Sequence, residues 1–148
     1  MTQKAIPETL GYLLVQICRA HRGKAQERLS QIGLHTGQEM FLLRLWRQDG
    51  QTQTELADEI CVQPATITRM IDRLAHAGLV ERRTDAEDRR VSRVYLTKEG
   101  RALQQLVENI WHELEQQSFA NLTLDEQVLL RRLLLQVHEN LVHVSKSL

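Results

Sequence analysis

The sequence predicts a mainly α-helical chain with one small β-hairpin, and three features of the pattern support this fold class. Apolar residues recur at helical spacing over most of the 148 residues. Two capping boxes, Thr52–Glu55 and Thr123–Glu126, mark helix starts. Between residues 79 and 96 the period changes to that of two short strands around a charged loop. The expected chain is therefore a series of helices interrupted once by a hairpin.

Two helices are expected before the hairpin region. Residues 8–32 form the first, which ends at Gly33, and its apolar stripe consists of Leu10, Leu13, Leu14, Ile17, Leu29 and Ile32. Residues 38–48 form the second, which is apolar on most sides and is therefore expected to lie centrally in the core.

Two short helices over about residues 52–77 lead into the hairpin. Thr52 caps the first, and Pro64 suits the first position of the second because its missing N–H costs nothing there. Gly78 is expected at the C′ position after the second helix. Strands at 79–83 and 93–96 complete a unit of two helices and a hairpin, which is typical of a winged helix-turn-helix with its wing at about 79–96.

The terminal helices carry more apolar surface than one small winged-helix module could cover. These are residues 8–32, 98–119 and 124–145. Two-fold dimerisation would bury that surface, and it would set two copies of the second short helix one DNA turn apart, roughly 34 Å. The predicted fold class is thus a winged helix-turn-helix with N- and C-terminal dimerisation helices.

Composition excludes several other classes. Apolar residues make up 42% of the chain and charged residues 26%, as in ordinary soluble proteins. We expect no membrane span, because no run of about 18 apolar residues occurs. The N-terminus lacks an apolar signal run, so a cytoplasmic location is expected. No Gly-rich phosphate loop, nucleophile elbow or metal-type Cys/His spacing occurs, so we expect no enzyme, cofactor or metal.

Charge is distributed unevenly although the net charge is zero. Residues 63–101 contain nine basic and six acidic residues, whereas residues 102–148 contain three and six. A locally basic face can bind phosphates even in a neutral chain. The excess of positive charge coincides with the predicted second short helix and wing.

Ile67, Ile71 and Leu74 would point inward from the helix that starts at Pro64, which leaves a polar outer face. A major groove about 12 Å wide admits one such helix, and the fork of Arg69 matches the O6 and N7 atoms of guanine. An arginine in the wing loop could enter a narrow minor groove. The candidate DNA-binding residues are Gln63, Pro64, Thr66, Thr68, Arg69, Arg73, Arg82, Arg89, Arg90 and Arg93.

Several of these residues have a second interpretation. Gln63, Thr66 and Thr68 contact the DNA backbone or merely cap and face solvent. Arg73 contacts a phosphate or pairs with a wing carboxylate. Arg82, Arg89 and Arg93 contact phosphates or only add solubility. Asp88 is expected to pair with a nearby arginine and hold the shape of the wing loop.

The run from Ala65 to Leu74, the segment Gly78–Arg82, the tripeptide Asp88-Arg89-Arg90 and the segment Leu96–Gly100 together resemble the MarR (multiple antibiotic resistance regulator) family. The resemblance extends over nearly the whole chain. It implies a single MarR-type domain over 1–148, with a winged helix-turn-helix at 36–97 and dimerisation helices at 1–35 and 98–148.

The family resemblance also implies a function. Such proteins are homodimers that bind palindromic operators in double-stranded DNA, usually as repressors, and many release DNA on binding phenolic or other amphipathic anions. By motif, Arg69 matches the base-reading arginine, Arg90 matches the minor-groove arginine, and Asp88 matches the wing aspartate. The alternative from another class is a winged-helix module that binds protein; arginines on both helix and wing favour DNA.

The remaining polar and aromatic residues receive structural interpretations. Cys18 is expected in the core or an interface, since it does not align with the peroxide-sensing cysteine of one family branch. Cys61 is interpreted as a small buried apolar residue. Trp46 and Trp111 are expected to pack in the core rather than to line an effector pocket.

Overall fold

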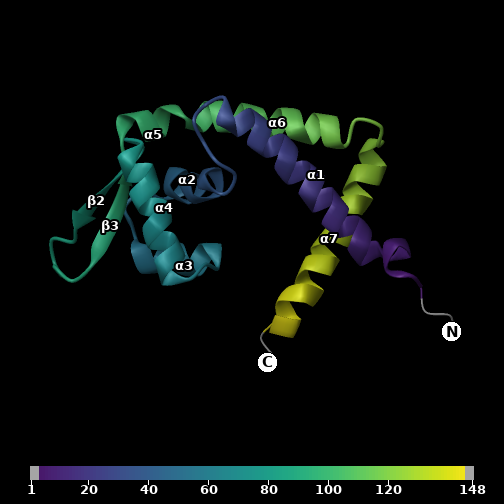
Figure 1. Cartoon of the computed structure of the whole chain (residues 1–148), viewed down its shortest axis with the longest axis horizontal. Coiled ribbons are helices and arrows are strands. Elements are labelled where there is room, and N and C mark those ends of the chain that lie inside the picture. The colour runs from purple at the N-terminus through teal and green to yellow at the C-terminus, as the bar shows by residue number, and fades with distance from the viewer. Residues whose placement is uncertain (1–3, 146–148) are drawn as a thin grey trace. The chain divides into compact units, whose positions relative to one another are not determined.

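The computed structural model describes residues 4–145 and confirms the predicted fold class (Figure 1). It contains a short 3-10 turn, seven α-helices and a three-stranded antiparallel sheet among these residues. In chain order these are η1 (Ile6–Glu8), α1 (Leu10–Ser30), α2 (Gln38–Arg47), β1 (Gln51–Thr52), α3 (Gln53–Ile60), α4 (Pro64–His76), β2 (Val80–Thr84), β3 (Ser92–Leu96), α5 (Lys98–Ala102), α6 (Gln104–Ser118) and α7 (Leu124–Ser145). The chain divides into two compact units, one ending at Leu114 and one starting at Glu115.

The core of the first unit is built around α2, as the apolar character of that helix predicts. Phe41, Leu42 and Leu45 of α2 are buried. The other fully buried large side chains come from α1, the following loop, α3, α4 and β3, and they are Leu29, Leu34, Leu56, Ile67, Ile71, Leu74 and Val94. Burial of a side chain of this size contributes about 1.5–3 kcal/mol, so the helix-turn-helix is fixed mainly by this shared core.

Both predicted ends of α4 are confirmed. Pro64 occupies the first turn of the helix. At the other end Gly78 has a φ of +75°, its N–H donates to the carbonyl of Ala75, and Leu79 donates to the carbonyl of Leu74. This pair of hydrogen bonds is a Schellman motif, which favours glycine at that position because the left-handed conformation strains other residues.

The sheet contains one strand more than the sequence predicts. β1 pairs with β3 antiparallel, with Gln51 opposite Val94 and Thr52 opposite Arg93, so the strand order is β1-β3-β2. β1 has only two residues, and Thr52 also caps α3 through the confirmed capping box with Glu55. A strand this short shows no alternation, which is why only the helix start is visible in the sequence.

The single helix predicted over 98–119 is wrong. The structure has two helices, α5 and α6, separated at Leu103. The carbonyl of Gly100, which a continuous helix would use for its own ladder, accepts a hydrogen bond of 3.0 Å from the indole Nε1 of Trp46. Leu103 packs against the core at the break. Tertiary contacts therefore interrupt a segment whose apolar spacing is helical throughout.

Two side chains, those of Cys61 and Trp111, are more exposed than the sequence predicts. Cys61 is exposed, not buried, because it is the C-cap of α3 with a φ of 58°, and its Sγ lies 3.6 Å from the carbonyl oxygen of Asp58. Trp111 is 38% exposed and packs its ring against His21, whereas Trp46 packs against the core as expected. Cys18 is also exposed within the single chain.

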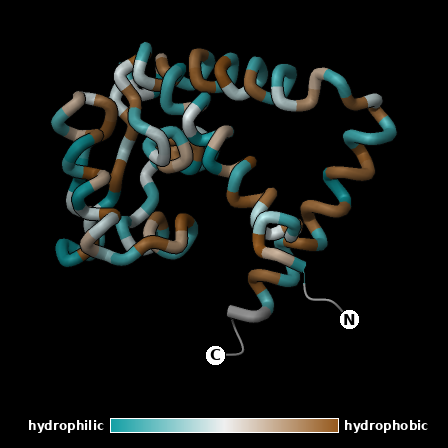
Figure 2. Tube along the Cα trace, turned by 45° about the vertical axis from the view of Figure 1, so that its right-hand side comes forward, coloured by the Kyte–Doolittle hydropathy of each residue, from teal (hydrophilic) through white to brown (hydrophobic). Residues whose placement is uncertain are grey.

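The second unit consists of the end of α6, a short connection and α7. The predicted capping box at the start of α7 is confirmed, because Glu126 N–H donates to Thr123 Oγ1 and Thr123 N–H donates to the Glu126 carboxylate. Apolar residues recur along successive turns of α7 (Figure 2), and many of them are exposed. In the part of the chain described, no helix combines the length and apolar character that crossing a membrane requires.

Candidate nucleic-acid interface

The outer face of α4 is polar and accessible. Ile67, Ile71 and Leu74 are buried against the core, and this orients the helix. The opposite side is exposed and contains Gln63, Pro64, Thr66, Arg69 and Arg73 of the predicted set. The sequence-predicted division of α4 into two faces is therefore present, with α3 packed against the helix (Figure 1).

The side chains of Arg69 and Arg73 have no hydrogen bond or ion pair within residues 4–145. The predicted alternative of an ion pair between Arg73 and a wing carboxylate is not found. Such a link between α4 and the wing does exist with reversed charges, because Arg82 of β2 contacts Asp72 of α4 at 2.5 Å. Arg82 also donates to the carbonyl of Thr68 at 3.2 Å. Both arginines of α4 are thus left available for a ligand.

The hydroxyl of Thr68 has two partners inside the protein. It donates to the carbonyl of Pro64 at 2.9 Å and accepts from Gln53 Nε2 at 2.6 Å. A hydroxyl has a single proton, so Thr68 as placed has none to offer a phosphate oxygen. The contact with Gln53 instead joins the start of α3 to α4.

The wing loop between β2 and β3 is shaped by two carboxylates that bind backbone N–H groups. Asp85 Oδ1 accepts from Glu87 at 2.8 Å and from Asp88 at 3.1 Å. Asp88 Oδ1 accepts from the backbone of Arg90 at 3.0 Å and from its Nε at 3.2 Å. The expected pairing of Asp88 with an arginine is present. Sequence reasoning missed Asp85, whose Asx-turn position before Ala86 and Glu87 was the available signal.

Arg93 lies at the base of the wing. Its Nε is 2.5 Å from Asp85 Oδ2, and one terminal nitrogen donates to the carbonyl of Gly50 at 2.9 Å. These contacts join β3, the wing loop and the turn before β1. Arg93 therefore has a structural role in the unbound chain. The predicted phosphate contact would have to be made by a guanidinium group that already binds Asp85 and Gly50.

The wing tip presents two exposed cations. Arg89 makes no hydrogen bond or ion pair with any residue the structure describes, and the Arg90 side chain is 91% exposed despite its pairing with Asp88. An ion pair at this exposure contributes little stability. Both guanidinium groups are therefore free to move to an anionic ligand at small cost.

The carboxyl of Asp85 gives the wing a defined acid sensitivity. Its hydrogen bond with Arg93 is the largest cause that lowers its pKa to about 2, and the N–H groups of Glu87 and Asp88 add to the effect. Because folding lowers the pKa of Asp85, its ionised carboxyl stabilises the folded wing. This stabilisation is complete above the ordinary carboxyl pKa of about 3.9 and is lost as the pH falls through about 2.

We expect the carboxyl ¹³C resonance of Asp85 to stay almost unchanged in an acid titration down to about pH 3, where an ordinary carboxyl is mostly protonated. Asp85→Asn should shift the amide resonances of Glu87 and Asp88 at neutral pH, because it removes the charge that Arg93 contacts. A wild-type midpoint near pH 4 for the Asp85 carboxyl would contradict this assignment.

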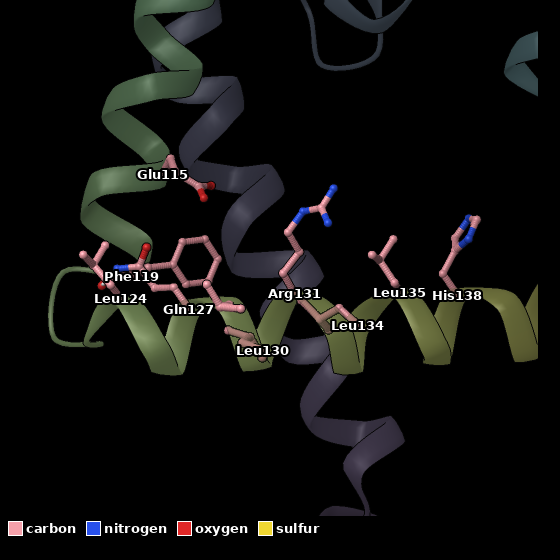
Figure 3. A pocket seen from close by; sticks show the side chains of 10 residues that line it. Glu115, Phe119, Leu124, Gln127, Leu130, Arg131, Leu134, Leu135 and His138 are labelled. Carbon is pink, nitrogen blue, oxygen red and sulfur yellow. Dashed lines mark hydrogen bonds between the residues drawn. The ribbon is translucent and has the colours of Figure 1, made fainter.

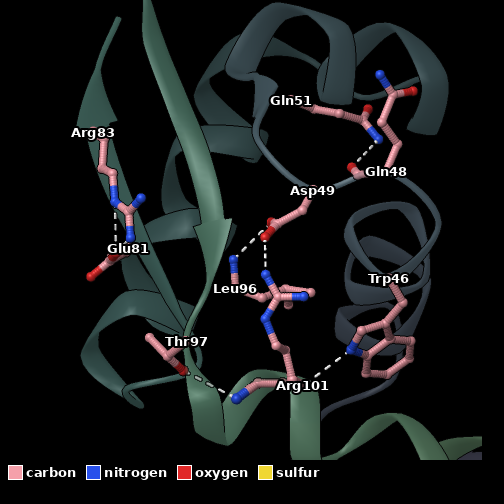
Figure 4. A network of polar contacts seen from close by, with 10 residues as sticks. Trp46, Gln48, Asp49, Gln51, Glu81, Arg83, Leu96, Thr97 and Arg101 are labelled. Atoms are coloured by element: carbon pink, nitrogen blue, oxygen red, sulfur yellow. Dashed lines mark hydrogen bonds and ion pairs between the residues drawn. The ribbon is translucent and has the colours of Figure 1, made fainter.

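A second polar network fixes the wing to the helices behind it (Figure 4). Asp49 Oδ1 accepts from the N–H of Leu96 at 2.9 Å, and Asp49 Oδ2 contacts Arg101 at 2.5 Å. On the outer side of the hairpin, Arg83 pairs with Glu81 and lies 4.4 Å from the centre of the Tyr95 ring. The contacts of Asp49 join the turn after α2 to β3 and α5, whereas those of Arg83 stay within the hairpin.

Comparison with known proteins supports the same assignment as the geometry. The model of the MarR family matches residues 36–92. A crystal structure of MarR is 30% identical, with a TM-score of 0.82, and the alignment covers 99% of this chain and 100% of that chain. A mutant MarR from E. coli complexed with operator DNA is 29% identical over 91% of this chain and 99% of its own, with a TM-score of 0.81.

A third structure, an S. aureus MepR-DNA complex, is 26% identical, covers 93% of this chain and 99% of its own, and has a TM-score of 0.79. Among residues 4–145 no group of three or more His, Cys, Asp or Glu side chains could hold a metal ion.

The similarity to these structures includes the terminal helices as well as the winged helix-turn-helix. With 30% identity to MarR over almost its full length, the chain belongs to the MarR family of transcriptional regulators.

Proposed function

We propose that this chain is a repressor that binds a palindromic operator as a homodimer, with α4 in the major groove and the wing arginines beside it. The observation that carries the proposal is the set of unpaired or exposed arginines on α4 and the wing, namely Arg69, Arg73, Arg89 and Arg90. The buried apolar core and partly buried polar contacts hold the elements beneath them, so these side chains are presented on a fixed frame. The MarR complex with operator DNA and the MepR-DNA complex support the same use of the face here.

The homodimer is supported by apolar surface that the chain leaves uncovered. On α1, Leu10, Leu13 and Ile17 are each more than half exposed. Around α7 an open hollow of about 620 Å³ is lined mainly by apolar side chains, with Glu115, Arg131 and His138 at its sides (Figure 3). The lining residues are Glu115, Phe119, Leu124, Gln127, Val128, Leu130, Arg131, Leu134, Leu135 and His138.

Exposed apolar surface on this scale marks an interface, and a second copy of the chain is the occupant we propose. Light scattering of the full chain should give twice its 17.2 kDa mass. A monomer at micromolar concentration would contradict the dimer without bearing on the DNA-binding face. Release of DNA by a small amphipathic or phenolic effector, and a cytoplasmic location, complete the proposal.

Arg69→Ala tests the proposed base contact. The substitution should weaken operator binding by about 1–3 kcal/mol and relax the preference at one base position, because a bidentate arginine–guanine contact is lost. Operator fragments selected from the source genome, and single-base variants of them, supply the binding series. Arg73→Ala is the matched control on the same helix face, and it should weaken binding equally for every sequence, since a phosphate contact carries no base information. Equal loss across all base variants for Arg69→Ala would contradict base reading.

Salt dependence separates the DNA-binding proposal from the alternative of a protein-interaction module. Each phosphate that the protein neutralises releases counterions, so the logarithm of the affinity for duplex DNA should fall steeply with the logarithm of salt concentration. A protein-interaction module would show no saturable, salt-dependent binding to duplex DNA.

A further inference from the structure

Arg82 joins the wing to α4 with both terminal nitrogens of its guanidinium group. Nη1 donates to Asp72 Oδ1 at 2.5 Å, and Nη2 donates to the backbone carbonyl of Thr68 at 3.2 Å. Thr68 and Asp72 lie four residues apart in α4, so both acceptors lie on the same face of the helix. The planar fork of an arginine can bind two acceptors at such a spacing, which the single ammonium of a lysine cannot match.

The contact falls on a part of β2 that the apolar core does not hold. β2 is an edge strand, since the strand order is β1-β3-β2. Its first residue, Val80, is buried, but residues 81–84 are exposed. Apolar packing therefore fixes only the base of β2. Arg82 supplies a contact with α4 farther along the strand, toward the loop that carries Arg89 and Arg90.

The other strand of the hairpin is anchored separately. Val94 of β3, which lies opposite Arg82 in the register, is fully buried. The neighbouring Arg93 donates to the carbonyl of Gly50 at 2.9 Å, which ties β3 to the turn before β1. Arg82 thus links the hairpin directly to α4, the helix that carries Arg69.

The exposure of the ion pair indicates where its effect should be seen. The Arg82 side chain is 32% exposed and that of Asp72 is 59% exposed, so the pair contributes little to the stability of the fold. DNA binding makes a stricter demand, because Arg69 and Arg90 are proposed to reach two grooves of one duplex at the same time. Holding the two elements in the bound arrangement lowers the entropic cost of forming both contacts together.

We propose that Arg82 is a positioning residue of the DNA-binding face and not one of its phosphate contacts. It holds the wing against α4, so that Arg90 meets the minor groove while Arg69 meets the major groove. The inference rests on the proposed operator binding, and it names the link that couples the two groove contacts. It also gives Asp72, a carboxylate on a face that meets phosphates, a reason to be there.

Asp72→Ala separates positioning from simple electrostatics by the sign of its effect. If Arg82 were a phosphate contact, removing a carboxylate beside it would strengthen operator binding. Positioning requires the opposite, and we expect the affinity to fall about tenfold in gel shifts at fixed salt, because each protomer loses the acceptor that holds its wing.

Glu87→Ala is the matched control for the lost carboxylate. The side chain of Glu87 is exposed in the wing and makes no hydrogen bond or ion pair within residues 4–145. Its removal changes the net charge as Asp72→Ala does but breaks no link to α4. Operator affinity should therefore stay the same or rise.

A second test asks whether Arg82 acts through Arg90. Arg82→Ala should weaken binding about tenfold in the wild-type chain but at most about twofold in an Arg90→Ala background, because the placement of the wing matters through the arginine that it presents. A phosphate contact of Arg82 itself, or a general loss of stability, would give the same loss in both backgrounds. Arg73→Ala, the proposed phosphate contact on α4, should keep its full effect in both.

A measurement without DNA makes failure of the link distinguishable from failure of operator binding. Residual dipolar couplings of the backbone amides in the free chain should fit one alignment tensor for α4 and the hairpin, and Arg82→Ala should require a second tensor for residues 81–92. Unchanged couplings would overturn the positioning role.

Equal or tighter operator binding by Asp72→Ala would also overturn the positioning role, as would equal losses from Arg82→Ala in the two backgrounds. Both results would leave operator binding standing. A wild-type chain without affinity for operator DNA would instead overturn the proposed function and with it the role of Arg82 in binding, while altered couplings would still show that Arg82 orients the wing.

Discussion

Gly100→Ala is expected to destabilise the chain by about 3 kcal/mol and to lower its melting temperature by about 10 °C. Gly100 is buried in α5, and a Cβ at this position would overlap the carbonyl oxygen of Leu79 and lie 3.3 Å from Leu96 Cδ2. The steric overlap outweighs the better helix propensity of alanine, which is at most about 1 kcal/mol.

The carbonyl of Leu79 has little freedom to move away from an added methyl group. It accepts a hydrogen bond of 3.1 Å from the N–H of Thr97, and the Thr97 hydroxyl donates to the adjacent carbonyl of Gly78 at 2.6 Å. Displacing Leu79 would therefore disturb the junction at which α4 ends, the wing begins and α5 starts. The added methyl group is therefore expected to strain the junction of α4, β2 and α5, which positions the wing.

Gly23→Ala is the matched control for this prediction. Gly23 lies in α1, also within a helix, and a Cβ there would have no atom within 4 Å. The control should leave stability unchanged or raise it by up to about 1 kcal/mol. Thermal unfolding followed by circular dichroism compares the two variants. If both shifted the melting temperature by the same amount, the close approach at Gly100 would not be a constraint on the fold.

The helices were predictable because their signals are local. Each signal acts within a few residues of the chain. Thr52 and Glu55 form a capping box, Pro64 starts α4, and Gly78 ends it with hydrogen bonds to the last turn. The buried stripe of α4 follows from helical spacing alone. Local hydrogen bonds and periodicity therefore account for the successful part of the fold prediction.

The missed features depend on residues distant in sequence. β1 exists because β3 lies beside it, and the break at Leu103 coincides with a hydrogen bond between Trp46 and Gly100. Cys61 is the exception, because its exposure follows from the local left-handed backbone at the end of α3, which the residue type alone does not indicate. None of these contacts leaves a periodic pattern in the chain.

The candidate site shows the same division. Which arginines lie on the outer face of α4 follows from helical spacing, so Arg69 and Arg73 could be placed in advance. The sequence does not show which wing arginines are already paired inside the protein, because that pairing depends on strand register. Arg82 and Arg93 face Asp72 and Asp85 respectively, while Arg89 remains unpaired within residues 4–145.

Arg90→Glu should weaken DNA binding by about 100-fold or more at fixed salt while the dimer stays intact. Each protomer of the proposed dimer would lose one proposed minor-groove cation and place a carboxylate against phosphates, and two protomers would share each operator. The dependence on salt concentration should become shallower by about one counterion per protomer. Gel shifts at several salt concentrations on the selected operator measure both effects.

The wing loop should survive this substitution, which makes the binding loss interpretable. The carboxylates of Asp85 and Asp88 hold the loop through backbone N–H groups, including the N–H of Arg90 itself, which glutamate retains. Unchanged amide resonances of Glu87 and Asp88 would verify that shape. Lys24→Glu on α1 is the control, because it changes the net charge equally at an exposed site outside the proposed interface. If the two charge reversals weakened binding equally, the effect would be one of overall charge, and Arg90 would have no specific contact with the groove.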